Sequence, residues 1–319
     1  MDGLGYTLRV PAAVLLAAVA AVLAPEKVVF VSTADGAVVQ TVRLPGRGIA
    51  IFAAPDQRVV VPLRDEDATA VVAPTGSVER WPGRVFPLFS SEYDRMGVVL
   101  PGMLVTLSYP ERLPLFRVPL EGVPGAVRAA CSEDGRVVAL IPSGAGGRTL
   151  VVVAAMEGGT AQTVALAGDA TSVVMADESG MAVTANGETL EAAALGEMRA
   201  RPALGVGGEV RSLCRVPPGG VILAGVEMGG AGGVVGLRVD PKARQPLREL
   251  FRTPLPAPVV ALAAAEEDLV AVSGDEIVVL ARKGRRVART VTVPGAYDVA
   301  LLPSTAKSTV PQWGDAARP

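Results

Sequence analysis

The sequence predicts an all-β fold, a seven-bladed β-propeller built from four-stranded antiparallel blades. Three observations support this prediction. A unit consisting of a turn followed by apolar strands recurs seven times along the 319 residues. Its copies start 37 to 49 residues apart, close to the roughly 40–45 residues of a propeller blade. The seventh copy is split between the two ends of the chain, as expected for a closed ring.

Each copy of the unit opens with a turn that contains glycine or proline. Between the openings lie short stretches rich in Val, Leu and Ala, separated by turns such as Asp134-Gly135 and Pro74-Thr75-Gly76 that are typical of β-hairpins. The longest copy contains the stretch Met228–Gly233, which predicts a lengthened loop. The seven openings are centred on Gly46, Gly83, Gly125, Gly168, Gly208, Ala257 and Gly295.

The ends of the chain predict how the ring closes. Residues 27–44 contain two strands, residues 296–303 contain one, and residues 309–313 contain a weaker candidate. We therefore expect a shared blade with two strands from each end. An alternative takes residues 10–24 as the missing first strands, but that run has no polar turn. The propeller is expected over residues 27–313, followed by a tail at residues 314–319.

The N-terminal residues 1–26 predict a signal or anchor segment. Residues 10–24 form fifteen consecutive uncharged residues, preceded by Arg9 and followed by Pro25-Glu26-Lys27. This run is short for a membrane span, which needs about 20 residues, but it suits the apolar part of a signal peptide, with Ala18-Val19-Ala20 as a cleavage motif. We therefore expect a periplasmic or extracellular protein, membrane-anchored if the segment is uncleaved. The alternative is a helix or strand pair packed on the propeller in a cytoplasmic protein.

Composition narrows the chemistry. The chain contains no histidine, so the commonest general base and metal ligand are unavailable. Its two cysteines, Cys131 and Cys214, are expected to be unpaired, buried thiols in matching inner strands. Neither a metal site nor a cofactor is expected. The formal net charge of −2 argues against a nucleic-acid partner, which requires a concentrated basic surface.

The clearest copy of the unit, residues 276–302, resembles a known family. Thr290-Val291-Thr292-Val293-Pro294 is similar to the end of the last strand in YVTN-type propellers, a bacterial group with WD-repeat-like blades. Gly295-Ala296-Tyr297-Asp298-Val299-Ala300 is similar to the start of their next repeat. The resemblance covers roughly residues 27 to 303, although the tetrapeptide that names the family is absent. It implies an exported propeller with a binding function and brings no catalytic motif.

Charged residues in the blade-opening turns predict one candidate binding surface. These turns should surround the mouth of the central channel, a place where folds of this kind accept ligands. Basic residues on two neighbouring blades and acidic residues on roughly opposite blades would polarise the mouth towards a charged partner. The alternative interpretation is ordinary solvated loop charge. The candidate residues are Arg47, Arg84, Asp169, Glu209 and Asp298.

A local concentration of aromatic residues predicts a second candidate surface. Only 4% of the chain is aromatic, yet Trp81, Phe86, Phe89 and Tyr93 lie close together in the sequence, next to Arg95. Trp, Tyr and Arg are preferred anchors in protein interfaces. Trp81, Tyr93 and Arg95 are therefore candidate partner-binding residues. In the alternative interpretation the two phenylalanines belong to the core and Trp81 ends a strand.

Together these features predict a non-enzymatic propeller that binds a protein partner as a scaffold or accessory subunit. Two alternatives remain open. One is a propeller that senses a small ligand at the channel mouth. The other is a hydrolase that uses carboxylates and a metal.

Overall fold

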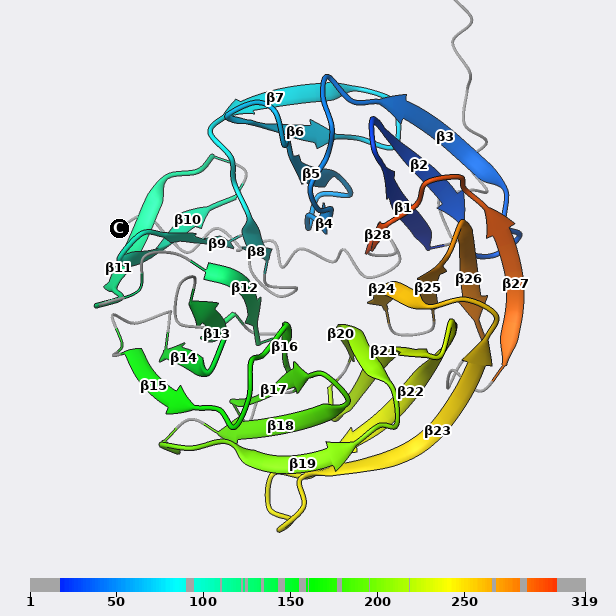
Figure 1. The fold of residues 1–319 in the computed structure, drawn as a ribbon. Coiled ribbons are helices and arrows are strands. Elements are labelled where there is room, and N and C mark those ends of the chain that lie inside the picture. The colour runs from blue at the N-terminus through cyan, green and yellow to red at the C-terminus, as the bar shows by residue number, and fades with distance from the viewer. Residues whose placement is uncertain are drawn as a thin grey trace, which may run out of the picture.

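The computed structural model confirms the predicted fold. It describes residues 18–302 except 90–94, 110, 122, 124–125, 133–134, 143–146, 155–158, 160, 177–179, 195, 218, 266–267 and 282–285. The described residues form 28 strands in seven four-stranded sheets, without a helix. The sheets stand around a central axis as the blades of a propeller (Figure 1). Every pairing within a blade is antiparallel.

The blades are numbered in chain order, and their strands are given from the axis outwards. Blade 1 contains β28 (Asp298–Leu302), β1 (Val19–Ala24), β2 (Lys27–Ser32) and β3 (Val38–Arg43). Blade 2 contains β4 (Phe52–Ala53), β5 (Val59–Pro62), β6 (Ala68–Val72) and β7 (Val78–Pro82). Blade 3 contains β8 (Pro87–Phe89), β9 (Arg95–Leu100), β10 (Met103–Ser108) and β11 (Pro114–Pro119). Blade 4 contains β12 (Ala126–Cys131), β13 (Val137–Pro142), β14 (Thr149–Ala154) and β15 (Ala161–Ala165).

The remaining blades follow the same order. Blade 5 contains β16 (Ser172–Met175), β17 (Met181–Asn186), β18 (Thr189–Ala194) and β19 (Arg201–Gly205). Blade 6 contains β20 (Glu209–Val216), β21 (Val221–Met228), β22 (Ala231–Val239) and β23 (Leu247–Leu255). Blade 7 contains β24 (Val259–Ala264), β25 (Leu269–Ser273), β26 (Glu276–Leu280) and β27 (Val287–Thr292).

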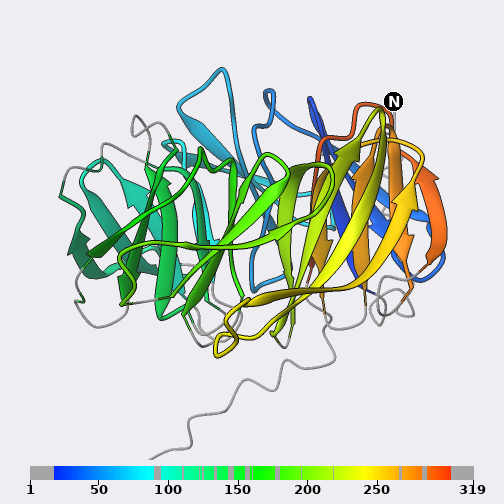
Figure 2. The same cartoon turned by 60° about the horizontal axis from the view of Figure 1, so that its bottom comes forward.

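The strands run between the two faces of the ring (Figure 2). One face, here called the crossover face, carries the loops that join the outer strand of one blade to the inner strand of the next. These loops contain the predicted openings of the repeat unit. The described openings therefore lie on the same face of the ring.

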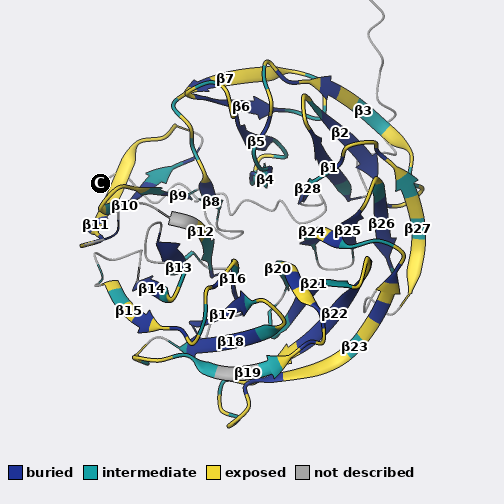
Figure 3. Cartoon of the chain, viewed as in Figure 1, coloured by how far each residue is buried: buried dark blue, intermediate teal, exposed yellow. Residues whose placement is uncertain are grey.

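The core consists of apolar layers between neighbouring blades. The two middle strands of a blade are covered on both sides, so they read as continuous apolar runs rather than as alternating ones. Val59, Val60 and Val61 of β5 are all buried, as are Val28, Val29 and Phe30 of β2. The outer strands alternate more and expose polar side chains at the rim (Figure 3). Small and β-branched residues thus fill a core that contains few aromatic rings.

The ring closes with one C-terminal strand and three N-terminal strands, so the predicted two-plus-two arrangement is wrong. Strand β1 lies between β28 and β2 and pairs with both along its length. The propeller therefore begins before residue 27, because residues 19–24 of the predicted signal or anchor segment belong to blade 1. Residues 10–24 lack a polar turn, which argued against two strands there. Only one strand, β1, is formed in this run, and Pro25-Glu26 forms the turn from β1 to β2. The predicted strand at residues 309–313 and the tail at residues 314–319 lie outside the described residues.

The extra length of blade 6 resides mainly in its strands and not in the predicted loop at residues 228–233. Its four strands have eight or nine residues each, and Gly229-Gly230 is a tight turn between β21 and β22. The remaining glycines allow close packing. A Cβ atom on Gly236 would lie 2.1 Å from the ring of Phe251, and one on Gly232 would lie 2.1 Å from the carbonyl oxygen of Ala257. Glycine at these positions therefore permits close packing within blade 6 and against blade 7.

Five of the seven outer strands contain a β-bulge near their start, which the sequence did not predict. In each case one residue of the outer strand has no partner on the neighbouring strand. A bulge bends an edge strand and changes the direction of nearby side chains, which protects the strand from edge-to-edge pairing. The bulged residues are Val39, Leu115, Ala203, Leu250 and Ala288.

Candidate functional site

Three of the predicted channel-mouth residues are exposed on the crossover face. Arg47 lies in the loop between blades 1 and 2 and is exposed. Asp169 forms an exposed ion pair with Arg148 at 3.3 Å. Glu209 forms an ion pair with Arg211 at 2.9 Å, and Arg211 also contacts Glu227 at 2.8 Å. Exposed pairs of this kind contribute at most about 1 kcal/mol to stability, so they leave these side chains accessible without fixing them strongly.

Arg84 holds a neighbouring turn in place. Its Nε donates a hydrogen bond to the carbonyl oxygen of Leu63 at 2.9 Å, and its Nη2 donates to that of Arg64 at 2.7 Å. Its backbone N–H donates to the Asp67 carboxylate at 3.0 Å. These bonds tie the blade-2 turn between β5 and β6 to the loop that leads into blade 3. The guanidinium of Arg84 is therefore engaged within the chain.

Asp298 links the C-terminal strand of blade 1 to blade 2. It is the first residue of β28, and its Oδ2 accepts a hydrogen bond from the backbone N–H of Ile51 in blade 2 at 2.9 Å. The adjacent Tyr297 hydroxyl donates to the carbonyl oxygen of Gly48 at 2.6 Å. Strand β28 is thus fastened to the second blade as well as to β1. Burial raises the pKa of Asp298 from 3.8 to about 6, with the two backbone hydrogen bonds opposing the rise.

The raised pKa of Asp298 predicts a pH-dependent effect of the substitution Asp298→Asn. Because the folded protein holds this proton more tightly than the unfolded chain, the Asp298 contribution lowers the free energy of unfolding as pH rises from about 4 to 6. A shift from 3.8 to about 6 corresponds to about 3 kcal/mol at most. The substituted side chain can still accept the Ile51 hydrogen bond but does not titrate. The free energy of unfolding of the Asp298→Asn variant, measured with urea, should therefore rise relative to that of the wild type as pH increases across that interval.

An exposed carboxylate provides the control for this experiment. The matched variant is Asp169→Asn, which makes the same change at a carboxylate that is exposed on the crossover face. Unfolding curves measured by circular dichroism give the difference between variant and wild type at each pH. A difference for Asp298→Asn that stays constant over this interval would contradict the assignment.

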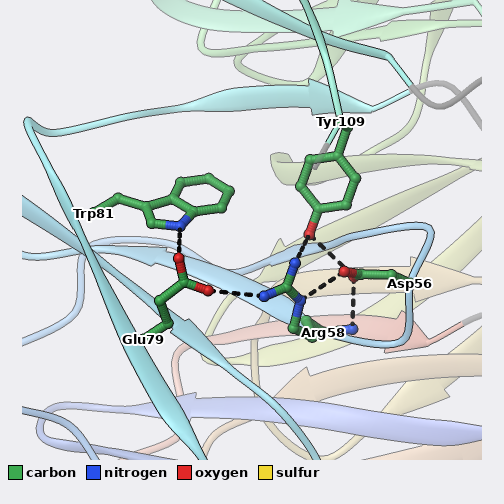
Figure 4. A network of polar contacts seen from close by, with 5 residues as sticks. All are labelled: Asp56, Arg58, Glu79, Trp81 and Tyr109. Carbon is green, nitrogen blue, oxygen red and sulfur yellow. Dashed lines mark hydrogen bonds and ion pairs between the residues drawn. The ribbon is translucent and has the colours of Figure 1, made fainter. Parts of the chain in front are cut away.

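The predicted aromatic region contains a polar network between blades 2 and 3 (Figure 4). Arg58 donates to Asp56 at 2.6 Å, to Glu79 at 2.9 Å and to the Tyr109 hydroxyl at 3.3 Å. Tyr109 donates to Asp56 at 3.0 Å, and the indole N–H of Trp81 donates to Glu79 at 2.8 Å. Burial, together with the charge of Asp56, raises the pKa of Tyr109, which keeps its hydroxyl protonated. The network ties Tyr109 of blade 3 to the two chain segments of blade 2.

The structure places Trp81 inside the protein, only 2% exposed, beneath the side chain of Arg112. The Arg112 guanidinium carbon lies 4.6 Å from the Trp81 ring centre. Trp81 lies near the end of β7, as the alternative interpretation expected. Phe89 is half-buried and contacts Tyr109 edge-on, whereas Phe86 is exposed and contacts Phe52. Placing Phe86 in the core is therefore wrong.

The other two aromatic-region candidates have different outcomes. Arg95 is half-buried at the start of β9, and its guanidinium carbon lies 5.9 Å from the ring centre of Phe116. Tyr93 lies outside the described residues. Trp81 thus belongs to the packed contact between blades 2 and 3, where it bonds to Glu79 of the polar network. Arg95 instead lies over Phe116 on the outer strand of blade 3.

Sequence reasoning missed the exposed apolar residues of β11 and the turn before it. Leu113 is 62% exposed, Leu115 43% and Phe116 36%. Leu115 is the bulged residue of β11, which interrupts the alternation that would otherwise bury one of two consecutive residues. The run Leu113-Pro114-Leu115-Phe116 was visible in the sequence, but only the edge position and the bulge make it a surface. We call Leu113, Leu115 and Phe116, together with Arg95, Arg112 and Arg117, the blade-3 rim.

Both cysteines lie on inner strands, as predicted, and neither forms a disulfide. Both are half-buried rather than fully buried. Burial raises the pKa of Cys214 to about 12, so its thiol stays protonated. Among the described residues, no group of three or more His, Cys, Asp or Glu side chains is arranged to hold a metal ion. The described part of the chain also has no helix with the length and apolar character to cross a membrane.

Comparison with known proteins shows the fold. No protein-family model and no curated protein matches the chain. The WD40 repeats of RRP9 match with a TM-score of 0.64 and 12% identity over 90% of this chain and 91% of that one. A chain of the Mitotic Checkpoint Complex matches with 0.62 and 12% over 81% and 85%, respectively. Hydrazine synthase from Kuenenia stuttgartiensis matches with 0.59 and 10% over 79% and 89%.

Identities this low carry the architecture and not the activity. The matched proteins include a synthase as well as WD40 repeats, so the fold accommodates different functions. Membership of the YVTN-type family stays a prediction. The chain is a seven-bladed β-propeller with WD40 propellers among its structural neighbours.

Proposed function

We propose that this propeller is a protein-interaction module that acts as a scaffold or accessory subunit. The observation that carries the proposal is the blade-3 rim, where Leu113, Leu115 and Phe116 are exposed close together. Contiguous exposed apolar surface on a soluble domain marks a contact with another molecule more often than single exposed residues do. The ring behind it is closed by strand pairing and loop hydrogen bonds, so a partner meets a preorganised surface.

The structural neighbours are compatible with this proposal. One of them is a chain in the Mitotic Checkpoint Complex, which is an assembly of proteins. The alternative of a carboxylate and metal hydrolase has no comparable observation in its favour among the described side chains. We therefore infer a binding role without turnover.

We also propose that the protein is exported, and that residues before Ala18 serve as the signal or anchor. Ala18 is buried, and its carbonyl oxygen accepts hydrogen bonds from the backbone and the hydroxyl of Thr33. Cleavage after the Ala18-Val19-Ala20 motif would remove the first two residues of β1. Processing that is compatible with blade 1 therefore has to occur before Ala18 or not at all.

Affinity purification tests the proposed function. A tagged full-length chain, cross-linked in native cells and isolated from membrane and soluble fractions, should enrich the same protein partner at least tenfold over a tagged unrelated propeller. Binding should then be reproduced with the two purified proteins. Failure to enrich any protein reproducibly, or turnover of ester or lactone substrates by the purified chain with added calcium, would argue against the proposal. Mass spectrometry of the purified chain gives its N-terminus.

A further inference from the structure

We infer that the outer rim of blades 5, 6 and 7 docks on an anionic lipid surface. This membrane contact goes beyond the proposed function and uses other residues than the blade-3 rim. In every blade a turn joins the third strand to the outer strand. Because the outer strand ends on the crossover face, this outer turn lies on the other side of the ring, here called the opposite face. The charge of the outer turns differs between the two parts of the ring.

The outer turns of blades 5, 6 and 7 contain nine basic residues and two acidic ones, each turn being counted up to the second residue of the outer strand. The corresponding turns of blades 1 to 4 contain one basic residue and four acidic ones. Since the whole chain has a formal net charge of −2, positive charge is concentrated in one sector of the rim. The turns of blades 5 to 7 are residues 195–202, 240–248 and 281–288, and those of blades 1 to 4 are residues 33–39, 73–79, 109–115 and 155–162.

Most of the basic side chains in this sector have no carboxylate partner. Glu197 pairs with Arg201 at 3.0 Å, and Asp240 accepts a hydrogen bond from the backbone N–H of Lys242 at 3.1 Å. Six other cationic groups are exposed and form no ion pair within the described part of the chain, so they are available to an external anion. These residues, here called the basic rim, are Arg199, Arg238, Lys242, Arg244, Arg248 and Arg286.

Two residues of the basic rim oppose each other directly. Arg238 of β22 and Arg248 of β23 are register partners, so their side chains leave the same face of the blade-6 sheet. Like charges at directly opposite positions destabilise a sheet. Neither arginine has an ion-pair partner among the described carboxylates. Blade 6 therefore carries a repulsion that an external anion would relieve.

Exposed apolar side chains accompany the basic rim. Met198 is 81% exposed and Val287 is 42% exposed, and each is the sequence neighbour of a basic-rim arginine. Arg201 donates a hydrogen bond to the carbonyl oxygen of Ala243 at 3.4 Å, which ties the start of β19 to the outer turn of blade 6. Surfaces that combine basic and apolar side chains bind anionic membranes, because the charges meet the headgroups while the apolar groups enter the acyl boundary.

Acidic residues of the same blades belong to turns nearer the axis. The turns from the first to the second strand in blades 5 and 7 contain Asp177, Glu178 and, in residues 266–268, three further acidic residues. The strands that these turns join are two strand spacings, or about 10 Å, inside the third and outer strands. That separation exceeds the Debye length of about 8 Å at physiological salt. The contact is therefore made edge-on, through the rim, and not with the whole opposite face.

A lipid surface fits these observations better than a nucleic acid or an acidic protein does. The six basic residues fall within the four to eight that are typical of sites for anionic lipids. They are spread over three blades whose outer strands follow one another along the rim, which suits a flat partner (Figure 1). The chain also enters blade 1 from the opposite face, at Val19, and residues 10–17 before it are uncharged. Blade 1 packs against blade 7, so this apolar segment precedes a blade that adjoins the basic rim.

Vesicle flotation with the purified full-length chain tests the inference. Vesicles of phosphatidylcholine and phosphatidylserine should bind the chain, and sodium chloride should weaken this binding because it screens exposed charges. The variant Lys242→Ser/Arg244→Ser/Arg248→Ser should bind these vesicles roughly a hundredfold more weakly, since each basic residue near an anionic surface contributes about fivefold. The variant Met198→Ser/Val287→Ser should also bind more weakly, but with the salt dependence of the wild type.

Variants on the crossover face provide matched controls. Arg43→Ser/Arg47→Ser/Arg64→Ser removes three exposed arginines, and Leu100→Ser/Val260→Ser removes two exposed apolar side chains. Both should bind the vesicles as the wild type does. Vesicles of phosphatidylcholine alone measure the part of the binding that needs no anionic lipid. No variant should melt at a lower temperature than the wild type, which separates loss of the surface from loss of the fold.

Several results would overturn the inference. Equal binding of the blade-6 triple variant and the wild type to anionic vesicles would do so, as would the absence of any gain from phosphatidylserine. An equal loss of binding in the crossover-face variants would also do so. Retention on polyglutamate or DNA without vesicle binding, if the triple variant loses it, would assign the basic rim to an acidic protein or a nucleic acid. Capture of a protein partner through the blade-3 rim does not involve these residues, so the proposed function stands or falls separately.

Discussion

A chain that starts at Pro25 should fail to form a stable propeller, whereas a chain that starts at Ala18 should fold. Removing residues 1–24 deletes β1, which pairs with both β28 and β2. Without β1 these two strands are no longer connected and the ring opens. The deletion also removes Val22 and Leu23, both fully buried, and each contributes about 1.5–3 kcal/mol through burial alone. Together with the lost strand pairing, this approaches the whole stability of about 5–15 kcal/mol expected for a domain.

The comparison between the two truncations isolates β1 from the segment before it. Removing residues 1–17 leaves every described residue in place. Size-exclusion chromatography should give the elution volume of the full-length chain for this variant, and thermal unfolding followed by circular dichroism should show a cooperative transition. The longer truncation should aggregate or unfold without cooperativity. Equal melting temperatures for the two variants would show that β1 is not needed to close the ring.

The second large effect is expected for Trp81→Ala, which should lower the free energy of unfolding by about 3–5 kcal/mol. Trp81 is among the largest fully buried side chains and packs against Tyr109, with ring centres 6.2 Å apart. Alanine leaves a cavity between blades 2 and 3 and removes the hydrogen bond to Glu79 at 2.8 Å. Urea unfolding followed by circular dichroism gives the difference from the wild type.

Two further variants identify the source of the Trp81 effect. Trp81→Phe keeps much of the apolar volume but removes the indole N–H, so it should cost clearly less than alanine. Val78→Ala changes an exposed residue on the same strand and should alter stability by no more than about 0.5 kcal/mol. If Trp81→Ala also changed the free energy of unfolding by no more than this, Trp81 would not contribute to the packing between blades 2 and 3.

The repeat and the blade number could be predicted because they depend on local patterns. Turns with glycine or proline recur at nearly constant spacing, and each apolar stretch has the length of one strand. Hairpin turns such as the one at Pro74-Thr75-Gly76 lie where the sequence placed them, between β6 and β7. This information survives without knowledge of contacts between distant residues.

The position of β1 could not be predicted in the same way. A strand covered on both faces is a continuous apolar run, and so is the central part of a signal peptide. The sequence Val19-Ala20-Ala21-Val22-Leu23-Ala24 fits both descriptions. The distinction comes from β28 at the other end of the propeller. Blade 1 receives only this one strand from the C-terminal side, so β1 has to supply the fourth strand.

The candidate site was predicted only in part, because a charge pattern does not reveal which charges are engaged. Arg84 lies in the loop where the sequence placed it and Asp298 is the first residue of β28, yet both form hydrogen bonds within the chain. The exposure of Leu115 depends on a bulge, which is a property of the pairing between β10 and β11. Such features arise from tertiary contacts, so composition and spacing do not report them.

The order of strands in blade 1 constrains the synthesis of this protein. The nascent chain releases β1, β2 and β3 first, but β28 leaves the ribosome after the other described strands. Until then, the inner edge of β1 has no partner within the polypeptide, and unpaired strand edges promote aggregation. Closure of the ring therefore follows the synthesis of the other blades, and the inner edge of β1 stays unpaired while they are made.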